Sequence, residues 1–400
     1  MSELGPVGER ERLVVLDILR GFALLGVLIG NTFWLYSGRA WLDEPTHSSA
    51  DRVARWFVAI FVESKAQTLL CFLFGFGFAH QLLRAQARAE QVMGVYVRRM
   101  LALFVIGWLH VTLLWWGDVT WGYAVAGFGL LLFRNATNRT RLIAAAVLIF
   151  VPFLVVSIPE VADALVRMFF KPGEGALHFH AIAERQQHGS YLRVMRGHVV
   201  FALVWQVRIF GWYYFWLLGR FLIGYIGGVQ QWFARDGADH LPLFRKLLVG
   251  GALIASANIA VQIASLLDVF DNYELSLAAR LALDGFDQLG LLAMVAMYVA
   301  IVVLLVQRPW WRRVLGVLAP VGRMPLTTYL CQSLICVTLF YGWGFGWAGH
   351  VGMANCVGLC LAIFVVQIAV SHLWLRSFRF GPAEWVWRAV VYWKRPAMRR

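Results

Sequence analysis

The sequence has little charge, and acidic residues are its scarcest charged class. Only 14% of the 400 residues are charged, whereas 60% are hydrophobic, and the mean hydropathy is +0.66. A soluble domain of this length does not bury so much apolar surface in a single core. The composition therefore excludes an ordinary soluble protein and indicates a chain surrounded by lipid.

Cysteine is also scarce, and its spacing does not fit a metal site. The five cysteines all lie in apolar runs, and no two of them form a CxxC pair. An odd number of cysteines in lipid-embedded segments argues against a disulfide framework. We expect these residues to be small buried hydrophobic side chains, and we predict no metal.

Basic residues outnumber acidic residues by 36 to 22, which gives a net charge of +14. In a soluble protein this charge would suggest a nucleic-acid partner. Here the arginines collect in short segments between apolar runs, and we find no zinc-finger spacing, RNP-like aromatic motif or basic helix. We therefore exclude nucleic acid as a partner and interpret the charge as the positive-inside pattern of membrane proteins.

Long apolar runs recur along the whole chain. A helix needs about 20 mostly apolar residues to cross the hydrocarbon core of a membrane. This criterion predicts about ten spans, near residues 13–36, 54–82, 99–117, 119–134, 141–158, 199–228, 246–267, 288–306, 319–341 and 351–375. Only Gly117 and Asp118 separate the third span from the fourth, which predicts a tight hairpin or a broken helix. The predicted fold class is an all-α, polytopic transmembrane helical bundle.

The charges of the loops predict how the bundle is oriented. Arginines concentrate in alternate loops and in the C-terminal tail, whereas most acids lie in the other set of loops. The positive-inside rule then places both termini in the cytoplasm. No A-x-A-like cleavage site follows the first apolar run, so we do not expect a cleaved signal peptide.

A single membrane domain over residues 1–400 is the simplest organisation, because we find no internal repeat and no low-complexity linker. Residues 1–158 form a predicted N-terminal half of five helices, and residues 199–400 form a C-terminal half of five helices. Residues 159–198 between them are the longest polar insertion, predicted to be an extracytoplasmic loop in position to cap a cavity. Its four histidines lack the carboxylates or cysteines of a zinc site.

Charged residues inside predicted spans are energetically costly and therefore point to function. Asp17 and Arg20 lie three residues apart on one helix face, where they can form an ordinary ion pair. Alternatively, Arg20 binds a phosphate-bearing donor, because a guanidinium group matches phosphate oxygens bidentately. Lys65 lies well inside the second predicted span, so it either pairs with an acid on another helix or belongs to a site.

His110 and Asp118 lie eight residues apart, about two helical turns, and so on roughly the same helix face. An imidazole can accept a proton from a hydroxyl or amine, or accept an acyl group, and a nearby carboxylate would orient it. A satisfied core histidine is the simpler alternative. Asn31 closes the first span, where its amide either donates to an oxyanion or bonds another helix. His47, in the next loop, is a further candidate.

These residues lie in segments that resemble the YeiB-like (DUF418) membrane proteins of bacteria. The matching segments are Leu16 to Gly26 with Asn31 after it, Leu73-Phe74-Gly75-Phe76-Gly77 after Lys65, Gly107 to Asp118, Gly322 to Ser333 (starting Gly322-Arg323-Met324-Pro325-Leu326-Thr327) and Phe380-Gly381-Pro382-Ala383-Glu384-Trp385. The resemblance covers nearly the whole chain. It implies a multi-pass protein of the bacterial cytoplasmic (inner) membrane.

The Asp-x-x-Arg-Gly start, from Asp17 to Gly21, is followed by Asn31 ten residues after the glycine. This pattern resembles the lysosomal heparan-glucosaminide acetyltransferases and, with them, the membrane acyltransferases that modify extracytoplasmic sugars. In the heparan-glucosaminide acetyltransferases the catalytic pair is an asparagine that closes the first span and a histidine eleven residues later. Asn31 matches, but Leu42 stands at the histidine position. The resemblance therefore implies that His110 or His47 takes this role, or that the activity is absent.

The resulting hypothesis is a membrane acyltransferase that moves an acyl group from cytoplasmic acyl-CoA to an extracytoplasmic glycan or lipid. The predicted catalytic residues are His110, Asp118 and Asn31, and the predicted donor-binding residues are Asp17, Arg20, Lys65, Arg98, Arg99 and Arg323. The alternative is a transporter or lipid-binding protein without chemistry, in which His110, Lys65 and Asp17 form a relay. Expected partners are membrane lipid and the acceptor, and the sequence is compatible with a homodimer.

Overall fold

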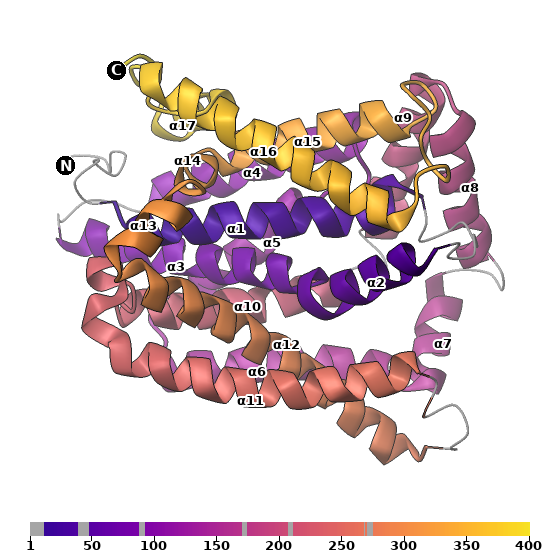
Figure 1. Ribbon diagram of the computed structural model, residues 1–400, viewed down its shortest axis with the longest axis horizontal. Helices are drawn as coiled ribbons and strands as arrows, with labels where there is room; N and C mark the ends of the chain where they lie inside the picture. Colours follow the sequence, from indigo (N-terminus) through magenta and orange to yellow (C-terminus); the bar gives the residue numbers. More distant parts are fainter. Residues whose placement is uncertain are drawn as a thin grey trace.

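The computed structural model describes residues 12–38, 48–87, 93–169, 174–206, 211–267, 269 and 275–400. All regular elements in these residues are helices, and their only β-type pairing is an isolated bridge between Phe378 and Arg399. Figure 1 shows long helices that run side by side along the longest axis of the molecule. The predicted all-α class is confirmed.

The helices are labelled in chain order, and η marks short π- or 3₁₀-helical segments. The part before the long insertion contains α1 (Val14–Asn31), η2 (Thr32–Tyr36), α2 (Ser49–Phe57), η3 (Val58–Val62), α3 (Lys65–Ala87), α4 (Met93–Leu113), α5 (Thr120–Gly129), η4 (Leu130–Phe133) and α6 (Asn138–Val156). The insertion contains α7 (Pro159–Phe169), α8 (Glu174–His188) and α9 (Tyr191–Val200). The rest contains η5 (Phe201–Gln206), α10 (Gly211–Val229), η6 (Ala234–His240), α11 (Leu241–Leu266), α12 (Leu277–Val306), α13 (Pro309–Gly316), α14 (Ala319–Arg323), α15 (Pro325–Phe340), α16 (Met353–Ser377) and α17 (Pro382–Tyr392).

Seven helical segments of the described chain are long and apolar enough to cross a membrane. They are Val14–Tyr36, Ser49–Ala87, Met93–Leu113, Asn138–Val155, Ala234–Leu266, Leu277–Val306 and Met353–Ser377. Two shorter apolar helical segments, Thr120–Phe133 and Pro325–Phe340, coincide with predicted spans, and so does α10. The protein is therefore a polytopic helical membrane protein, while the figure of ten spans and the inward orientation of both termini stay predictions.

The second predicted span, residues 54–82, is not one continuous helix. Helical segments α2 and η3 end before Glu63, and Ser64 adopts a left-handed conformation with φ of +61°. A non-glycine residue in this conformation cannot continue a right-handed helix. Lys65 therefore begins α3 instead of lying within a continuous helix, and its Nζ donates a hydrogen bond to the Ala59 carbonyl oxygen (2.8 Å).

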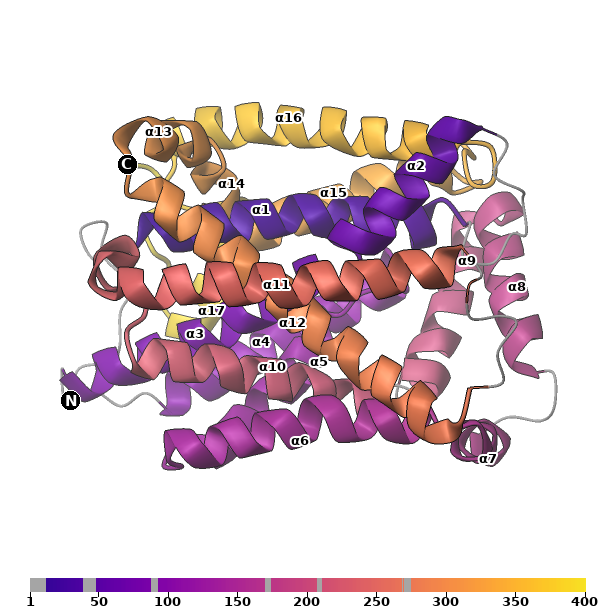
Figure 2. The same cartoon turned by 60° about the horizontal axis from the view of Figure 1, so that its bottom comes forward.

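The polar insertion is helical where the structure describes it. Pro159 opens α7 and Glu160 lies in its first turn, an arrangement that favours helix initiation. Figures 1 and 2 show α7, α8 and α9 at one end of the bundle, while the C-terminus and the start of α1 lie at the opposite end. The insertion is therefore a set of short helices, where the sequence suggested a loop.

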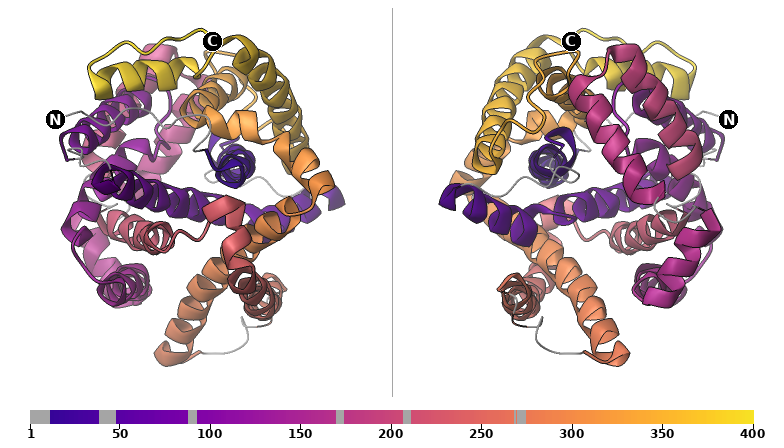
Figure 3. Two further views of the ribbon diagram at one scale, coloured as in Figure 1. Left: turned by 90° about the vertical axis from the view of Figure 1, so that its left-hand side faces the viewer. Right: turned by 90° about the vertical axis from the view of Figure 1, so that its right-hand side faces the viewer.

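Helix α1 lies near the centre of the bundle, as the end-on views of Figure 3 show. In its most apolar stretch 56% of the residues are buried by protein, compared with 17% in α6, which lies at the edge. Helices α3 and α10 cross in close contact at positions occupied by glycine. A Cβ atom on Gly75 of α3 would overlap the Phe221 carbonyl oxygen of α10, and one on Gly224 of α10 would overlap that of Phe72.

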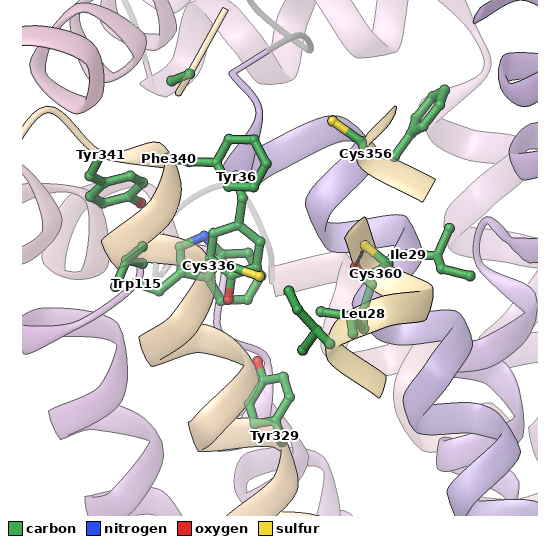
Figure 4. Close-up of a cluster of buried hydrophobic side chains, with 14 of the residues drawn as sticks. Leu28, Ile29, Tyr36, Trp115, Tyr329, Cys336, Phe340, Tyr341, Cys356 and Cys360 are labelled. Atoms are coloured by element: carbon green, nitrogen blue, oxygen red, sulfur yellow. Dashed lines mark hydrogen bonds between the residues drawn. The ribbon is translucent and has the colours of Figure 1, made fainter. Parts of the chain in front are cut away.

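One buried apolar cluster packs the end of α1 against α15 and α16 (Figure 4). In it the Tyr36 ring stacks on Trp115 with 4.3 Å between ring centres, and the Tyr36 hydroxyl donates to Ser333 Oγ (2.8 Å). Four of the five cysteines are buried free thiols, three of them in this cluster, whereas Cys331 is exposed. Most cysteines therefore do behave as small hydrophobic side chains.

Candidate functional site

A cavity of about 920 Å³ runs beside the central helix α1. Its wall includes Arg12 just before α1, Asn31 at the last position of α1, and Trp34 in η2. At 1.5 Å per residue, the 18 residues of α1 alone correspond to about 27 Å. Helices α3, α4, α5, α10, α14, α15 and α17 also contribute to the wall, so residues from both halves of the chain form one cavity.

Arginine side chains gather at one end of this cavity, which we call the basic end. The arginines in its wall are Arg12, Arg20, Arg84, Arg99, Arg323 and Arg388. Two acids, Asp17 and Glu384, line the same end. Asp17 Oδ1 accepts from Arg20 Nη1 at 2.9 Å, and Asp17 Oδ2 lies 3.7 Å from Arg12 Nε. Arginine therefore exceeds acid in this wall, and the basic end is suited to an anion.

Two glycines bring the basic end together. A Cβ atom on Gly322 would overlap the Asp17 carbonyl oxygen, and a Cβ atom on Gly21 would overlap that of Leu318. Helices α1 and α14 therefore touch backbone to backbone, which larger residues would prevent. This contact places Arg20 and Arg323, from segments near opposite ends of the chain, in one cavity wall.

Glu384 of α17 caps the start of α15. Its Oε1 accepts hydrogen bonds from the backbone N–H groups of Leu326 (2.6 Å) and Thr327 (3.1 Å), and its Oε2 accepts one from Thr327 Oγ1 (2.5 Å). A carboxylate at a helix N-terminus also interacts favourably with the helix dipole. Burial nevertheless raises the pKa of the Glu384 carboxyl, and these hydrogen bonds oppose that rise. The cap explains why two distant sequence motifs meet, and it fixes α17 over the basic end.

Helix α17 lies outside the candidate spans and covers the basic end with Glu384, Trp387, Arg388 and Tyr392. Burial is the main cause that lowers the pKa of Arg388, and the positive charges of Arg12 and Arg99 lower it further. Like charges held this close repel one another. A bound anion would relieve the repulsion, so the electrostatics of the basic end also fit an anionic ligand.

Of the arginines predicted to bind the donor, Arg98 is placed differently from the others. Its Nε donates to the Val391 carbonyl oxygen (2.8 Å), so it holds α17 and does not line the cavity. Arg99 does line the cavity, where its Nη1 donates to Gln81 Oε1 (2.9 Å) and its guanidinium lies 5.0 Å from the Trp387 ring centre. The geometry makes Arg98 a support for the wall.

Asp118 lies at the other end of the cavity, which we call the Asp118 end. Its Oδ2 accepts from the Thr120 backbone N–H (2.8 Å), and its Oδ1 accepts from Thr120 Oγ1 (2.7 Å) and the Tyr329 hydroxyl (3.0 Å). These contacts cap the start of α5. Asn31 and Tyr329 line the cavity with Asp118.

His110 lies directly behind Asp118, with Nδ1 2.9 Å from Oδ1, although the angle is poor for a hydrogen bond. The imidazole is buried, does not line the cavity, and its Nε2 has no hydrogen-bond partner among the described residues. The structure thus brings the predicted pair together, but the carboxylate faces the cavity. The eight-residue spacing assumed one helix, whereas α4 ends at Leu113 and Asp118 precedes α5.

The remaining predicted residues divide between the cavity wall and its surroundings. Asn31 lines the wall, whereas Lys65 does not, although its neighbours Glu63 and Ser64 do. His47 lies outside the described residues. Within the described chain, no group of three His, Cys, Asp or Glu side chains is arranged to hold a metal ion.

Arg220, which is 1% exposed in the middle of α10, was not predicted as a functional residue. The signal available was a lone arginine inside the aromatic and aliphatic run 211–229. Arg12 and Arg388 also line the cavity. In the sequence they look like ordinary charges that flank the spans, because only folding brings them to the cavity.

Comparison with known proteins identifies the family. The family described as "Protein of unknown function (DUF418)" matches residues 228–394. YxaH of Bacillus subtilis (strain 168) is 32% identical over 98% of this chain and 97% of its own length. YeiB of Escherichia coli (strain K12) is 27% identical over 95% of this chain and 96% of its own. Both relatives are described as uncharacterized.

A third relative, a 39.9 kDa protein encoded in the amylase 3′ region of Bacillus acidopullulyticus, is 28% identical over 97% of this chain and 96% of its own length. No solved structure matches the chain. The similarity to YxaH and YeiB extends over nearly the whole length, including the cavity-lining helices of both halves. The chain therefore belongs to the YeiB-like DUF418 family.

Proposed function

We propose that the protein is a membrane acyltransferase that uses acyl-CoA from the cytoplasm and acylates a hydroxyl or amine of an extracytoplasmic glycan or lipid. One observation carries the proposal: a single cavity has the arginine cluster at one end and Asp118, backed by His110, at the other. A donor with several phosphates and a reactive thioester needs these two ends in one continuous space.

The basic end suits the nucleotide part of the donor. Guanidinium groups bind phosphate oxygens through paired, charge-assisted hydrogen bonds. Arg20, Arg99 and Arg323 would make these bonds, with Asp17 orienting Arg20 through their 2.9 Å contact. The neutral arm of the donor would then lie along α1, with its thioester directed toward Asp118.

At the Asp118 end the acceptor oxygen attacks the thioester carbonyl carbon. Its proton passes to the Asp118–His110 pair, of which the carboxylate faces the cavity. The carbonyl oxygen becomes negative and accepts a hydrogen bond from the Asn31 amide. The C–S bond then breaks, and the departing thiolate takes up the proton, so the products are the ester and the free CoA thiol.

We place the protein in the bacterial cytoplasmic membrane with the basic end inward. The positive-inside pattern of the loops and the bacterial origin of the relatives support this placement. In this orientation the arginines meet a cytoplasmic donor, and the Asp118 end lies toward the acceptor. Membrane lipid surrounds the bundle, and a second copy of the chain is a further candidate partner.

Transport without chemistry is the second candidate function, and the break at Glu63 and Ser64 favours it. Both residues line the cavity, and discontinuous helices beside a central site are typical of secondary transporters. In that case Asp17, Arg20 and Asp118 would bind the transported solute.

An assay with isotope-labelled acetyl-CoA distinguishes acyl transfer from transport. The label is added to inside-out membrane vesicles that contain the wild type, Asp118→Asn or Arg139→Gln, the last an exposed arginine away from the cavity. If the protein transfers acyl groups, label should appear in the glycan or lipid fraction of vesicles with the wild type or Arg139→Gln. It should be lost in vesicles with Asp118→Asn. Equal, background labelling of all three refutes acyl transfer from this donor.

A further inference from the structure

We infer that Arg220 is the counter-charge for a negatively charged oxygen held in the cavity next to Tyr213. Arg220 lies in the middle of α10 and is 1% exposed. Its Nη2 donates one hydrogen bond, to Gln288 Oε1 (3.3 Å), and its guanidinium packs on the Trp216 ring. Its Nε and Nη1 have no hydrogen-bond partner in the described part of the chain.

Arg141 shows how this protein compensates a buried guanidinium when the role is structural. Arg141 is 6% exposed, and all three of its nitrogens donate hydrogen bonds. Its Nε and Nη2 donate to the Phe133 carbonyl oxygen, Nη2 donates to that of Arg134, and Nη1 donates to Asn138 Oδ1. Arg220 has one hydrogen bond and, among the described residues, no carboxylate within ion-pair distance.

A buried charge without a partner is expensive, particularly inside a membrane. Its retention indicates that the charge is compensated in a state of the protein that includes a ligand. Proteins commonly give up stability at such positions in exchange for function.

The surroundings of Arg220 show where the compensating charge would lie. Its guanidinium packs on the Trp216 ring, and that ring in turn stacks on Tyr213 with 5.5 Å between ring centres. The Cys71 thiol and the Tyr123 hydroxyl belong to the same polar surroundings. Tyr213 lies two helical turns before Arg220 on α10, and both tyrosines line the cavity. Arg220 therefore stands one layer behind the wall, and its charge acts across that layer because the interior screens it weakly.

The tyrosines are held in place by α3. Gln67 Nε2 donates to the Tyr213 hydroxyl, the Tyr123 hydroxyl donates to the Gln67 carbonyl oxygen (3.3 Å), and Cys71 Sγ donates to the Tyr123 hydroxyl (3.2 Å). This network gives the wall fixed polar groups in front of the positive charge. Preorganised groups of this kind stabilise a charge that develops during a reaction.

The inference rests on the proposed function for the identity of the oxygen, but not for its charge. If the protein transfers acyl groups, the oxygen is the thioester carbonyl oxygen, which becomes negative when the acceptor attacks. If the oxygen is already negative on the bound donor, Arg220 acts on binding instead. Arg220 would be a positioning residue in both cases, because it reaches the ligand through the wall.

The first test needs no substrate and compares Arg220→Met with Arg141→Met. Both variants of the purified full-length protein are melted in nanodiscs without ligand. Arg220→Met should melt at the same temperature as the wild type or higher, because it removes an uncompensated charge. Arg141→Met should melt lower, because it leaves carbonyl oxygens unpaired. A loss of melting temperature in Arg220→Met as large as that in Arg141→Met would overturn the inference.

The second test uses acetyl-CoA as the probe and adds Arg220→Lys, which keeps the charge. The oxygen is the thioester carbonyl oxygen if Arg220→Met lowers the transfer rate at least tenfold without changing the Kd for acetyl-CoA. Arg220→Lys should then restore part of the rate. A Kd that rises at least tenfold identifies an oxygen already charged on the donor. If neither quantity changes, the inference is wrong. If the wild type transfers nothing, the proposed function fails, and melting and Kd still decide the role of Arg220.

Discussion

The Asp118 carboxylate stands between His110 and the cavity, with Oδ1 2.9 Å from His110 Nδ1. A substrate in the cavity therefore meets the carboxylate first. In the proposed reaction the imidazole acts through its contact with that carboxylate. The pair has two separable tasks, because Asp118 also caps α5 whereas His110 makes no such cap.

Replacing each member of the pair should separate these tasks. His110→Ala should lower the rate of acyl transfer and leave the α5 cap intact, because Asp118 loses the imidazole that shares the acceptor's proton. Loss of a general base costs about two to four powers of ten in rate, which is the upper range expected here. Asp118→Ala should lower the rate as well and also cost about 1 kcal/mol of stability, because α5 loses its cap. Rate and melting measurements on the same preparations check this. Full activity in His110→Ala would make the imidazole a packing residue.

Arg20→Lys should weaken acyl-CoA binding about tenfold, equivalent to about 1.4 kcal/mol. Lysine keeps the charge but cannot form the planar, two-pronged hydrogen bonds of a guanidinium. Isothermal titration of purified protein with a non-transferable acyl-CoA thioether measures the effect. Arg139→Lys, at an exposed position away from the cavity, is the control and should bind like the wild type. Unchanged binding in Arg20→Lys would remove Arg20 from the donor site.

The contact between α1 and α14 should tolerate no side chain. Gly322→Ala places a Cβ atom against the Asp17 carbonyl oxygen, so it should cost about 1–3 kcal/mol and weaken acyl-CoA binding as Arg20 and Arg323 move apart. Gly358→Ala in α16 is the matched control, since nothing lies within 4 Å of its added Cβ. It should melt at the same temperature or slightly higher. Equal behaviour of the two variants would contradict the close approach.

The raised pKa of the Glu384 carboxyl predicts that the stability of the protein depends on pH. Burial raises its pKa above 4.5, so the folded protein favours the neutral carboxyl. The resulting stability is fully present below the pKa of an unfolded glutamate and is lost as the pH rises through the raised pKa of the folded state. The wild type should therefore melt progressively lower on going from pH 4.5 toward neutral pH. Glu384→Gln should show a smaller decline.

The control for this titration is Glu184→Gln, which replaces an exposed glutamate of α8. It should retain the decline of the wild type. Identical pH profiles for Glu384→Gln and the wild type would show that the α15 cap does not titrate in this range.

The orientation of the bundle is tested from outside the cell. Cys331 is exposed and must first be replaced, so that a single new cysteine at Lys394 reports the position of the tail. An impermeant thiol reagent should not label Lys394→Cys in intact cells, and it should label the residue after the cells are lysed. Ready labelling of intact cells would contradict a cytoplasmic C-terminus.

The helices could be predicted from the sequence because each apolar run is long and the membrane leaves the backbone few alternatives. The break at Ser64 could not, since residues 58–70 have no proline or glycine to mark it. It depends on a single left-handed residue, after which Lys65 bonds a carbonyl oxygen of the preceding turn.

The site was predictable in part for a related reason. Asp17 and Arg20 share one helix face, so local spacing was enough to pair them. The position of Asp118 in front of His110 depends on the turn between α4 and α5. Arg220 comes to lie behind the cavity wall only through the packing of α10 on α3. The spacing of residues along one helix does not predict the position of Asp118 or that of Arg220.

The backbone contact between Gly21 and Leu318 also orders the assembly of the protein in time. Helix α1 is the first described helix to be synthesised, yet α14, which it touches, follows only after most of the chain has been made. Since α14, α15 and α17 complete the basic end, a nascent chain has no complete basic end until its last segments are in place. A chain that stops before α14 therefore leaves Asp17 and Arg20 of α1 without the surfaces that enclose them.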